Sequence, residues 1–159
     1  MITFSRNIWF DADDNEITYK NILLHVTKYI NDGEKVYIGV DSMLYNSTCV
    51  FAIVIAFHNR DKKIAKYFFK RIKKKSHKFK DLQCKIMEEV NLALQTAQLI
   101  TRTFPTAEVE LHIDIGTEKE NATSKYFNFI KGWVTGTGYS LKVKPYSWAS
   151  SSVADWHTK

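Results

Sequence analysis

Apolar and polar positions follow two different periods along the chain, and the order of these segments predicts an α/β fold. Helical spacing of apolar residues covers 18–31, 81–103 and 123–134. Strand-like alternation or a continuous apolar run covers 35–42, 48–58, 63–72, 108–115 and 139–143. Ser150–Ser152 follows Pro145 and favours the start of a terminal helix that carries Asp155.

This order predicts a mixed five-stranded sheet, with three antiparallel strands in a meander followed by alternating helices and strands. Short connections and right-handed crossovers place helices on both faces and bring the ends of the first and fourth strands side by side. A chain of 159 residues fits a single domain, 1–159, with an N-terminal helix at about 18–31. We find no internal repeat, low-complexity tract or linker in the sequence.

Composition excludes several classes of protein. The content of 45% hydrophobic and 14% aromatic residues differs from that of disordered chains. No apolar run approaches the ~18 residues of a membrane span, and the N-terminus lacks an apolar secretory region, so we expect a cytoplasmic protein without a membrane partner. Cys49 and Cys84 have no second Cys or His at metal-ligand spacing, which argues against a disulfide framework and a zinc site.

Positive charge is concentrated in one segment, 70–80. The chain carries 23 Lys+Arg against 17 Asp+Glu, a formal net charge of +6, which suits a polyanionic partner without proving one. We predict that the basic residues of this segment bind nucleic-acid phosphates, with a solvated loop between strand and helix as the alternative. They are Lys70, Arg71, Lys73, Lys74, Lys75, Lys78 and Lys80.

Four acidic residues fall where the predicted fold can gather them: Asp41, Glu89, Asp114 and Asp155. Asp41 and Asp114 end neighbouring strands, and Glu89 shares the apolar face of the long helix, whereas Glu88 is turned about 100° away. Magnesium and manganese prefer carboxylate oxygens, and a two-metal phosphodiesterase needs several of them around two ions. The pattern predicts a site for two Mg²⁺ or Mn²⁺ ions, and we identify no residues for another cofactor.

Five segments resemble an uncharacterised, mainly bacterial family related to ribonuclease H, within the ribonuclease H-like superfamily. These segments are YIGVDS (Tyr37–Ser42), KIMEEV (Lys85–Val90), HIDIG (His112–Gly116), GWVTGTGY (Gly132–Tyr139) and KPYSWASSSVADWHTK (Lys144–Lys159). The resemblance covers most of the chain and implies a ribonuclease H-like fold. It also implies that the four acids match the catalytic, metal-binding positions of that superfamily.

The same resemblance implies a metal-dependent nuclease, in which one ion activates a water and a second stabilises the leaving 3′ oxygen. The expected partner is nucleic acid, as an RNA–DNA hybrid, RNA or structured DNA, with no obligate protein partner evident. The main alternative is a non-catalytic nucleic-acid-binding module that keeps the fold. A kinase-like phosphotransferase fits less well, because one small domain lacks the paired domains and the Gly-rich phosphate loop of that class.

Two histidines lie close to the acids in the sequence. His157 can assist proton transfer, since histidine titrates near neutral pH. It follows Asp155 by two residues on a helix, however, and therefore points elsewhere, which favours an exposed structural histidine. His112 shares the strand face of Asp114, where we expect it to support a metal ligand or to pack.

Overall fold

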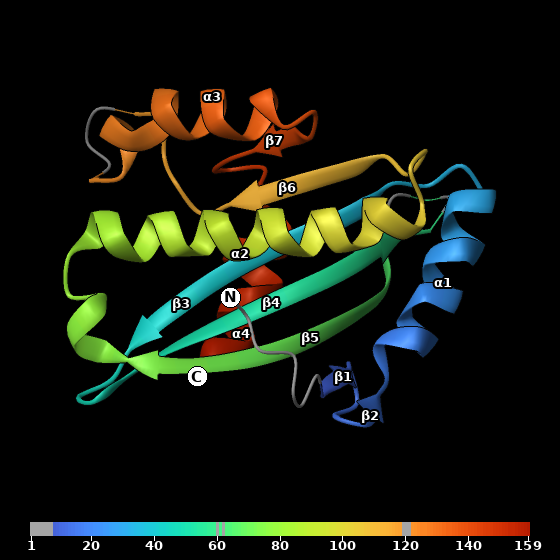
Figure 1. The fold of residues 1–159 in the computed structure, drawn as a ribbon, viewed down its shortest axis with the longest axis horizontal. Coiled ribbons are helices and arrows are strands. Elements are labelled where there is room, and N and C mark those ends of the chain that lie inside the picture. The colour runs from blue at the N-terminus through green and yellow to red at the C-terminus, as the bar shows by residue number, and fades with distance from the viewer. Residues whose placement is uncertain (1–7, 60, 62, 119–121) are drawn as a thin grey trace.

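A mixed seven-stranded sheet forms the centre of the molecule in the computed structural model (Figure 1). The structure describes residues 8–59, 61, 63–118 and 122–159. The strands are β1 (Trp9–Asp11), β2 (Glu16–Ile17), β3 (Val36–Leu44), β4 (Thr48–His58), β5 (Ile64–Lys75), β6 (Val109–Ile113) and β7 (Ser140–Lys142). The α-helices are α1 (Tyr19–Asn31), α2 (Leu82–Thr103), α3 (Phe127–Gly136) and α4 (Asp155–Thr158). Two short 3₁₀ segments, η1 (Ser76–Lys78) and η2 (Ser124–Tyr126), and a π-helical segment, η3 (Ala149–Ala154), complete the described elements.

The pairing of the long strands agrees with the predicted meander. The strand order is β2-β1-β5-β4-β3-β6-β7. The pairs β3–β4 and β4–β5 are antiparallel, whereas β6 is parallel to both β3 and β7. The chain therefore has the expected mixed sheet, and β3 and β6 are neighbours as predicted.

The prediction of five strands was wrong in number, because a short N-terminal hairpin adds β1 and β2 beside β5. Phe10 of β1 is paired with Phe69 of β5. The Asp11 carboxylate closes the turn of the hairpin by accepting the backbone N–H groups of Asp13 and Asn15, each at 2.9 Å. Strands of three and two residues are too short to show a period in the sequence.

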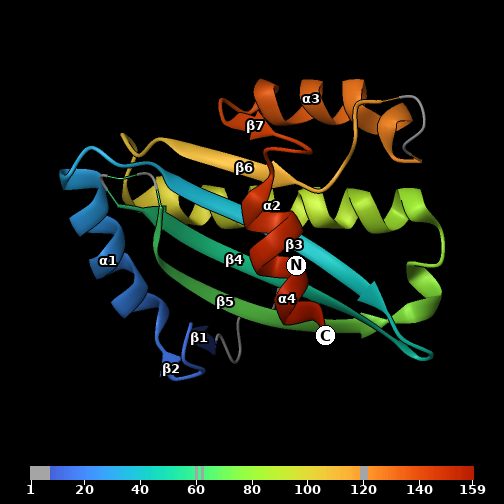
Figure 2. The ribbon, with the colours of Figure 1, turned by 180° about the vertical axis from the view of Figure 1, so that it is seen from behind.

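The two faces of the sheet are covered differently, as Figures 1 and 2 show from opposite sides. One face carries Val36, Ile38 and Val40 of β3 and forms the larger core with α1, α2 and α3. The opposite face packs against η3 and α4, which form one continuous terminal helix. Because side chains alternate along a strand, Asp41 lies on this second face together with Tyr37.

Several element boundaries differ from those predicted. β3 continues to Leu44, so Asp41 lies inside the strand rather than at its end, whereas β6 stops at Ile113 and leaves Asp114 directly after it. The terminal helix begins at Ala149, before the predicted serine cap. Its N-cap residue, Trp148, forms no capping hydrogen bond with its side chain. α1 matches the predicted N-terminal helix, and Thr18 caps it by accepting the N–H of Asn21 at 3.2 Å. Part of the predicted domain, residues 1–7, lies outside the described residues.

Candidate metal centre

Asp41 is the central acid of the candidate site. Its side chain is half-buried on the face of β3 that meets the terminal helix. Burial is the main cause that raises the pKa of Asp41, to about 7, and the carboxylates of Asp114 and Asp155 raise it further. A backbone hydrogen bond from Ser42 and the charge of Lys85 act in the opposite direction. The charges of two acids on other elements therefore act on the Asp41 carboxyl group, so the three acids lie near one another.

Glu89 reaches the same neighbourhood from α2, on the other side of β3. Its side chain is buried and accepts a short hydrogen bond from the hydroxyl of Ser42. Burial is again the main cause that raises the pKa, here to about 8, and Asp41 and Asp114 contribute in the same direction. Glu88 instead forms an ion pair with Lys74 at 2.5 Å. The helix thus directs Glu89, rather than Glu88, against β3, as its position on the apolar face predicts.

Asp114 and Asp155 are each paired with a lysine. The ammonium of Lys144 lies 3.4 Å from Oδ1 of Asp114, and this buried oxygen has no hydrogen bond from any described residue. The ammonium of Lys159 lies 3.2 Å from Oδ2 of Asp155, one helical turn earlier. Each acid thus has a partly exposed lysine beside it, and such a flexible side chain can exchange for another cation.

The four carboxylates do not form a closed metal cage. Across the part of the chain that the structure describes, no three His, Cys, Asp or Glu side chains stand together as a ready-made metal site. The chemistry of the donors nevertheless fits Mg²⁺ or Mn²⁺, because both ions prefer carboxylate oxygens and retain several waters. Burial, followed by the neighbouring carboxylates, raises the pKa of Asp41 and of Glu89, and Oδ1 of Asp114 lacks a hydrogen bond among the described residues.

The predicted basic segment is divided by the alternation of β5. Across the sheet, Asp41 pairs with Ala52 and Ala52 with Arg71, so Arg71 stands in the same cross-strand row as Asp41. Lys73 and Lys75 follow on that face, and all three basic residues are exposed. These three form what we call the β5 cation row.

The remaining basic residues of 70–80 lie elsewhere. Lys70 points to the opposite face, where it is buried and its ammonium lies 5.9 Å from the ring centre of Trp9. Burial lowers its pKa. Lys74 is engaged by Glu88, while Lys78 and Lys80 are exposed at and beyond η1. Lys70 is thus badly placed for a phosphate contact, although its charge resembles that of its neighbours in the sequence.

His157 is buried, which corrects the expectation of an exposed side chain. Its ring stacks on Phe69 with 3.6 Å between centroids, and Nε2 lies 3.1 Å from the hydroxyl of Tyr67. Burial, followed by the nearby charge of Arg71, lowers its pKa. The ring faces a pocket of about 280 Å³ whose lining includes Arg71 and the exposed Trp156. The histidine therefore anchors the terminal helix to β5.

Three lysines near the acids were missed in the sequence. Lys85 precedes Glu89 by four residues and Lys159 follows Asp155 by four, and this spacing places each pair on one face of a helix. A search for such pairs would have found both. Lys144 has no comparable signal, because it meets Asp114 only through the tertiary fold.

Comparison with known proteins identifies a family but no individual relative. The family model described as "Ribonuclease H-like" matches residues 18–159. Neither the curated proteins nor the solved structures contain a significant match. Within the described residues, no helix is both long and apolar enough to cross a membrane.

Proposed function

Because the chain belongs to the ribonuclease H-like family, we propose that it is a divalent-metal-dependent nuclease that hydrolyses phosphodiester bonds of nucleic acid. The observation that carries this proposal is the placement of the acids: Val40 is paired with Ile113, which brings Asp41 beside Asp114, and Glu89 is bonded to Ser42, the residue after Asp41. Acids placed on separate elements and left with raised pKa values favour a site that gains from a bound cation.

Asp41, Glu89, Asp114 and Asp155 would hold the ions. When bound, two Mg²⁺ or Mn²⁺ ions supply Lewis acidity that activates an attacking water and stabilises charge on the leaving 3′ oxygen. For Asp114 and Asp155 to act as ligands, their carboxylates have to exchange the ammonium groups of Lys144 and Lys159 for the ions.

Protein groups around the acids have separate tasks. The Ser42 hydroxyl fixes the orientation of Glu89 by donating to its Oε1, and Ser42 adjoins Asp41 in β3. Lys85 favours the ionised forms of both Asp41 and Glu89. Lys144, once released from Asp114, carries a positive charge at the edge of the site and is suited to contact a phosphate of the substrate.

The substrate strand is expected to cross the sheet face along the β5 cation row. Arg71 lies two strands from Asp41, roughly 10 Å away at the usual strand spacing, which suits contacts to phosphates near the one being hydrolysed. Contacts of this kind give affinity without sequence preference. An RNA–DNA hybrid, RNA or structured DNA is therefore the substrate class that we propose.

One observation favours the alternative of a non-catalytic binding module. Lys144 and Lys159 already form ion pairs with two of the four acids, and no closed metal cage is present among the described residues. A module of this kind would bind nucleic acid through the same cation row, but without hydrolysis.

Cleavage of a labelled substrate panel separates these functions. The panel contains an RNA–DNA hybrid, duplex DNA, a DNA junction and single-stranded RNA, each incubated with Mg²⁺, Mn²⁺ or EDTA. We expect cleavage of at least one substrate that requires metal and is lost in Asp114→Asn. Binding without cleavage by the wild-type protein under every condition would favour the module, and cleavage that persists in EDTA would exclude the metal mechanism.

A further inference from the structure

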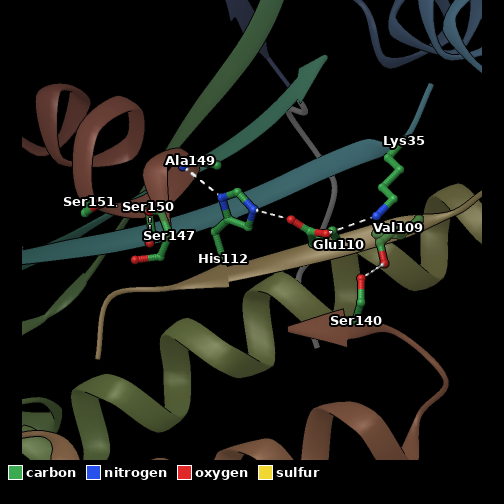
Figure 3. Close-up of polar contacts among 9 residues, drawn as sticks. All are labelled: Lys35, Val109, Glu110, His112, Ser140, Ser147, Ala149, Ser150 and Ser151. Atoms are coloured by element: carbon green, nitrogen blue, oxygen red, sulfur yellow. Dashed lines mark hydrogen bonds and ion pairs between the residues drawn. The ribbon is translucent and has the colours of Figure 1, made fainter. Parts of the chain in front are cut away.

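A series of hydrogen-bonded polar side chains, buried except at Lys35, connects the sheet to the first residue of the terminal helix (Figure 3). The backbone N–H of Ala149 donates to Nδ1 of His112 at 3.0 Å. On the other side of the ring, Nε2 of His112 lies 2.9 Å from Oε1 of Glu110, and Oε2 of Glu110 lies 3.4 Å from the ammonium of Lys35. We call these three side chains, Lys35, Glu110 and His112, the helix clamp.

The geometry determines the role of each atom in the clamp. Because Nδ1 accepts the amide proton of Ala149, the hydrogen of the neutral ring lies on Nε2, which donates to Glu110. Burial would raise the pKa of Glu110, but the bond from His112 and the charge of Lys35 outweigh it and lower the pKa. The buried carboxylate thus remains charged and holds the ring in one orientation, as carboxylates do for other functional histidines.

The clamp supplies a cap that the helix lacks locally. The first N–H groups of a helix have no partner within it, and the residue before η3 provides no side-chain cap. His112 of β6, on the sheet face that packs against the helix, caps the N–H of Ala149 instead. His112 is fully buried and Glu110 is almost so, and water therefore does not compete for these bonds.

Close packing fixes the same end of the helix. A Cβ on Gly39 of β3 would lie 2.2 Å from the carbonyl carbon of Ala149, so the helix backbone rests directly on the strand. The ring of Trp148 stacks on His58 with 4.6 Å between centroids and meets the ring of His112 edge-on at 5.0 Å. The start of the helix is thus held by both backbone contact and hydrogen bonding.

The far end of the helix has its own anchors on the sheet side. Nε of Arg71 donates to the carbonyl of His157 at 2.7 Å, and the hydroxyl of Tyr45 donates to the carbonyl of Thr158 at 2.7 Å. Asp155 lies between the two anchored ends, and its own side chain is partly exposed. The place of its carboxylate relative to Asp41 is therefore set by how the two ends are fixed.

We propose that His112 and Glu110, with Lys35 behind them, are positioning residues that hold Asp155 in register with Asp41 for metal binding. This inference rests on the proposed function, because it concerns the Asp155 ligand of that same metal centre. The helix clamp touches neither substrate nor metal. It acts through the N–H of Ala149 and the rigid helix that follows.

Two substitutions of His112 separate its two bonds. His112→Asn keeps an acceptor oxygen near the place of Nδ1, whereas His112→Gln keeps an N–H near the place of Nε2 and loses the acceptor. By titration calorimetry with Mn²⁺, we expect His112→Gln to weaken affinity about tenfold and His112→Asn by less than about threefold. In an Asp155→Asn background, His112→Gln should change the affinity by less than about twofold. An equal loss in both backgrounds, or equal effects of Asn and Gln, would overturn the proposal.

Amide hydrogen exchange provides a readout that does not depend on metal. We expect amides of 149–155 to exchange faster in His112→Gln than in His112→Asn, with amides of α2 unchanged. If the wild-type protein binds no Mn²⁺, the proposed function fails, and the exchange result still decides the clamp. If neither His112 variant folds, the exchange experiment uses Lys35→Ala, which changes the partly exposed member of the helix clamp. Faster exchange in 149–155 would then support the clamp, and unchanged exchange would overturn it.

Discussion

At the scale of single residues, the main feature of this protein is a deeply buried carboxyl group whose charge is only partly compensated. Glu89 is 3% exposed, and the hydroxyl of Ser42 is its hydrogen-bond donor. Ionised carboxylates in such surroundings cost free energy unless a positive charge compensates them. Lys85 provides part of that compensation, yet the pKa of Glu89 is still raised to about 8. The residue is therefore unfavourable for the stability of the metal-free protein at neutral pH.

The pKa of Glu89 has a direct consequence for stability. From its usual value of 4.5 up to about 8, the folded protein retains a proton that the unfolded chain has released, so stability decreases as pH rises through this range. In EDTA at pH 8, we expect Glu89→Gln to be more stable than wild type, on the order of a few kcal/mol, since one pKa unit corresponds to about 1.4 kcal/mol. Urea denaturation at pH 4 and pH 8 measures this difference.

Glu88→Gln is the matched control for that measurement. Glu88 lies on the same helix but is paired with Lys74, and Glu88→Gln keeps Glu89, so we expect its stability to fall between pH 4 and pH 8 about as that of wild type does. A Glu89→Gln protein less stable than wild type at pH 8 would show that the ionised carboxylate is compensated in the folded state, contrary to the raised pKa.

At the scale of elements, alternation along strands determines which residues can share a site. Every second residue of β5 faces the terminal helix side, which selects Arg71, Lys73 and Lys75 from a continuous basic segment. Packing of the terminal helix on β3 depends in the same way on one position, Gly39, which has no side chain. Both effects follow from the period of two in a strand.

Gly39→Ala is expected to displace the terminal helix. The new Cβ would overlap the backbone at Ala149, which cannot move as a flexible side chain can, so we expect a loss of stability of about 3 kcal/mol or more. Gly132→Ala on α3 is the control, because nothing lies within 4 Å of a Cβ there, and the better helix propensity of alanine should stabilise by up to about 1 kcal/mol. Thermal denaturation compares the two. Equal stability of Gly39→Ala and wild type would contradict the close packing.

The β5 cation row should determine how salt affects binding. Lys73→Ala/Lys75→Ala is expected to weaken binding of a hybrid duplex in EDTA by about tenfold or more, and to reduce the salt slope of log K by about one for each lost phosphate contact. Fluorescence anisotropy over a series of salt concentrations measures both. Lys20→Ala/Lys28→Ala on α1 removes the same charge from exposed positions on another element. If both double variants gave the same loss, net charge alone would explain the binding.

At the scale of the whole molecule, the sequence was sufficient for the order of the long elements but not for their ends or for the short strands. The long periodic segments predicted α1, α2 and the β3–β4–β5 meander, because burial of one face imposes a regular pattern. β1 and β2 were missed because they are short. Glu89 faces β3 as its place on the apolar side of α2 indicates, whereas Asp41 lies inside β3 and not at the strand end that the pattern predicted.

Tertiary contacts determine the side-chain positions and pairings that the hydrophobic pattern of the sequence could not predict. Lys70 and Lys73 look alike in the sequence, but the alternation of β5 buries the first beside Trp9 and exposes the second. The pairing of Asp114 with Lys144 joins residues that share no helix or strand, so no local rule predicts it. His112 was placed correctly on the face of β6, whereas its bond to Ala149 depends on how the terminal helix packs.

The most direct test of the central claim is the single-turnover cleavage rate of Asp41→Asn compared with wild type and Glu88→Gln. It is measured on the substrate that the wild-type protein cleaves best, over a series of Mg²⁺ concentrations. We expect the wild-type rate to require Mg²⁺ and Glu88→Gln to match it. Asp41→Asn should be slower by about 10³-fold, because ligands of catalytic metals support several kcal/mol of transition-state stabilisation. Cleavage by Asp41→Asn at the wild-type rate would contradict the account.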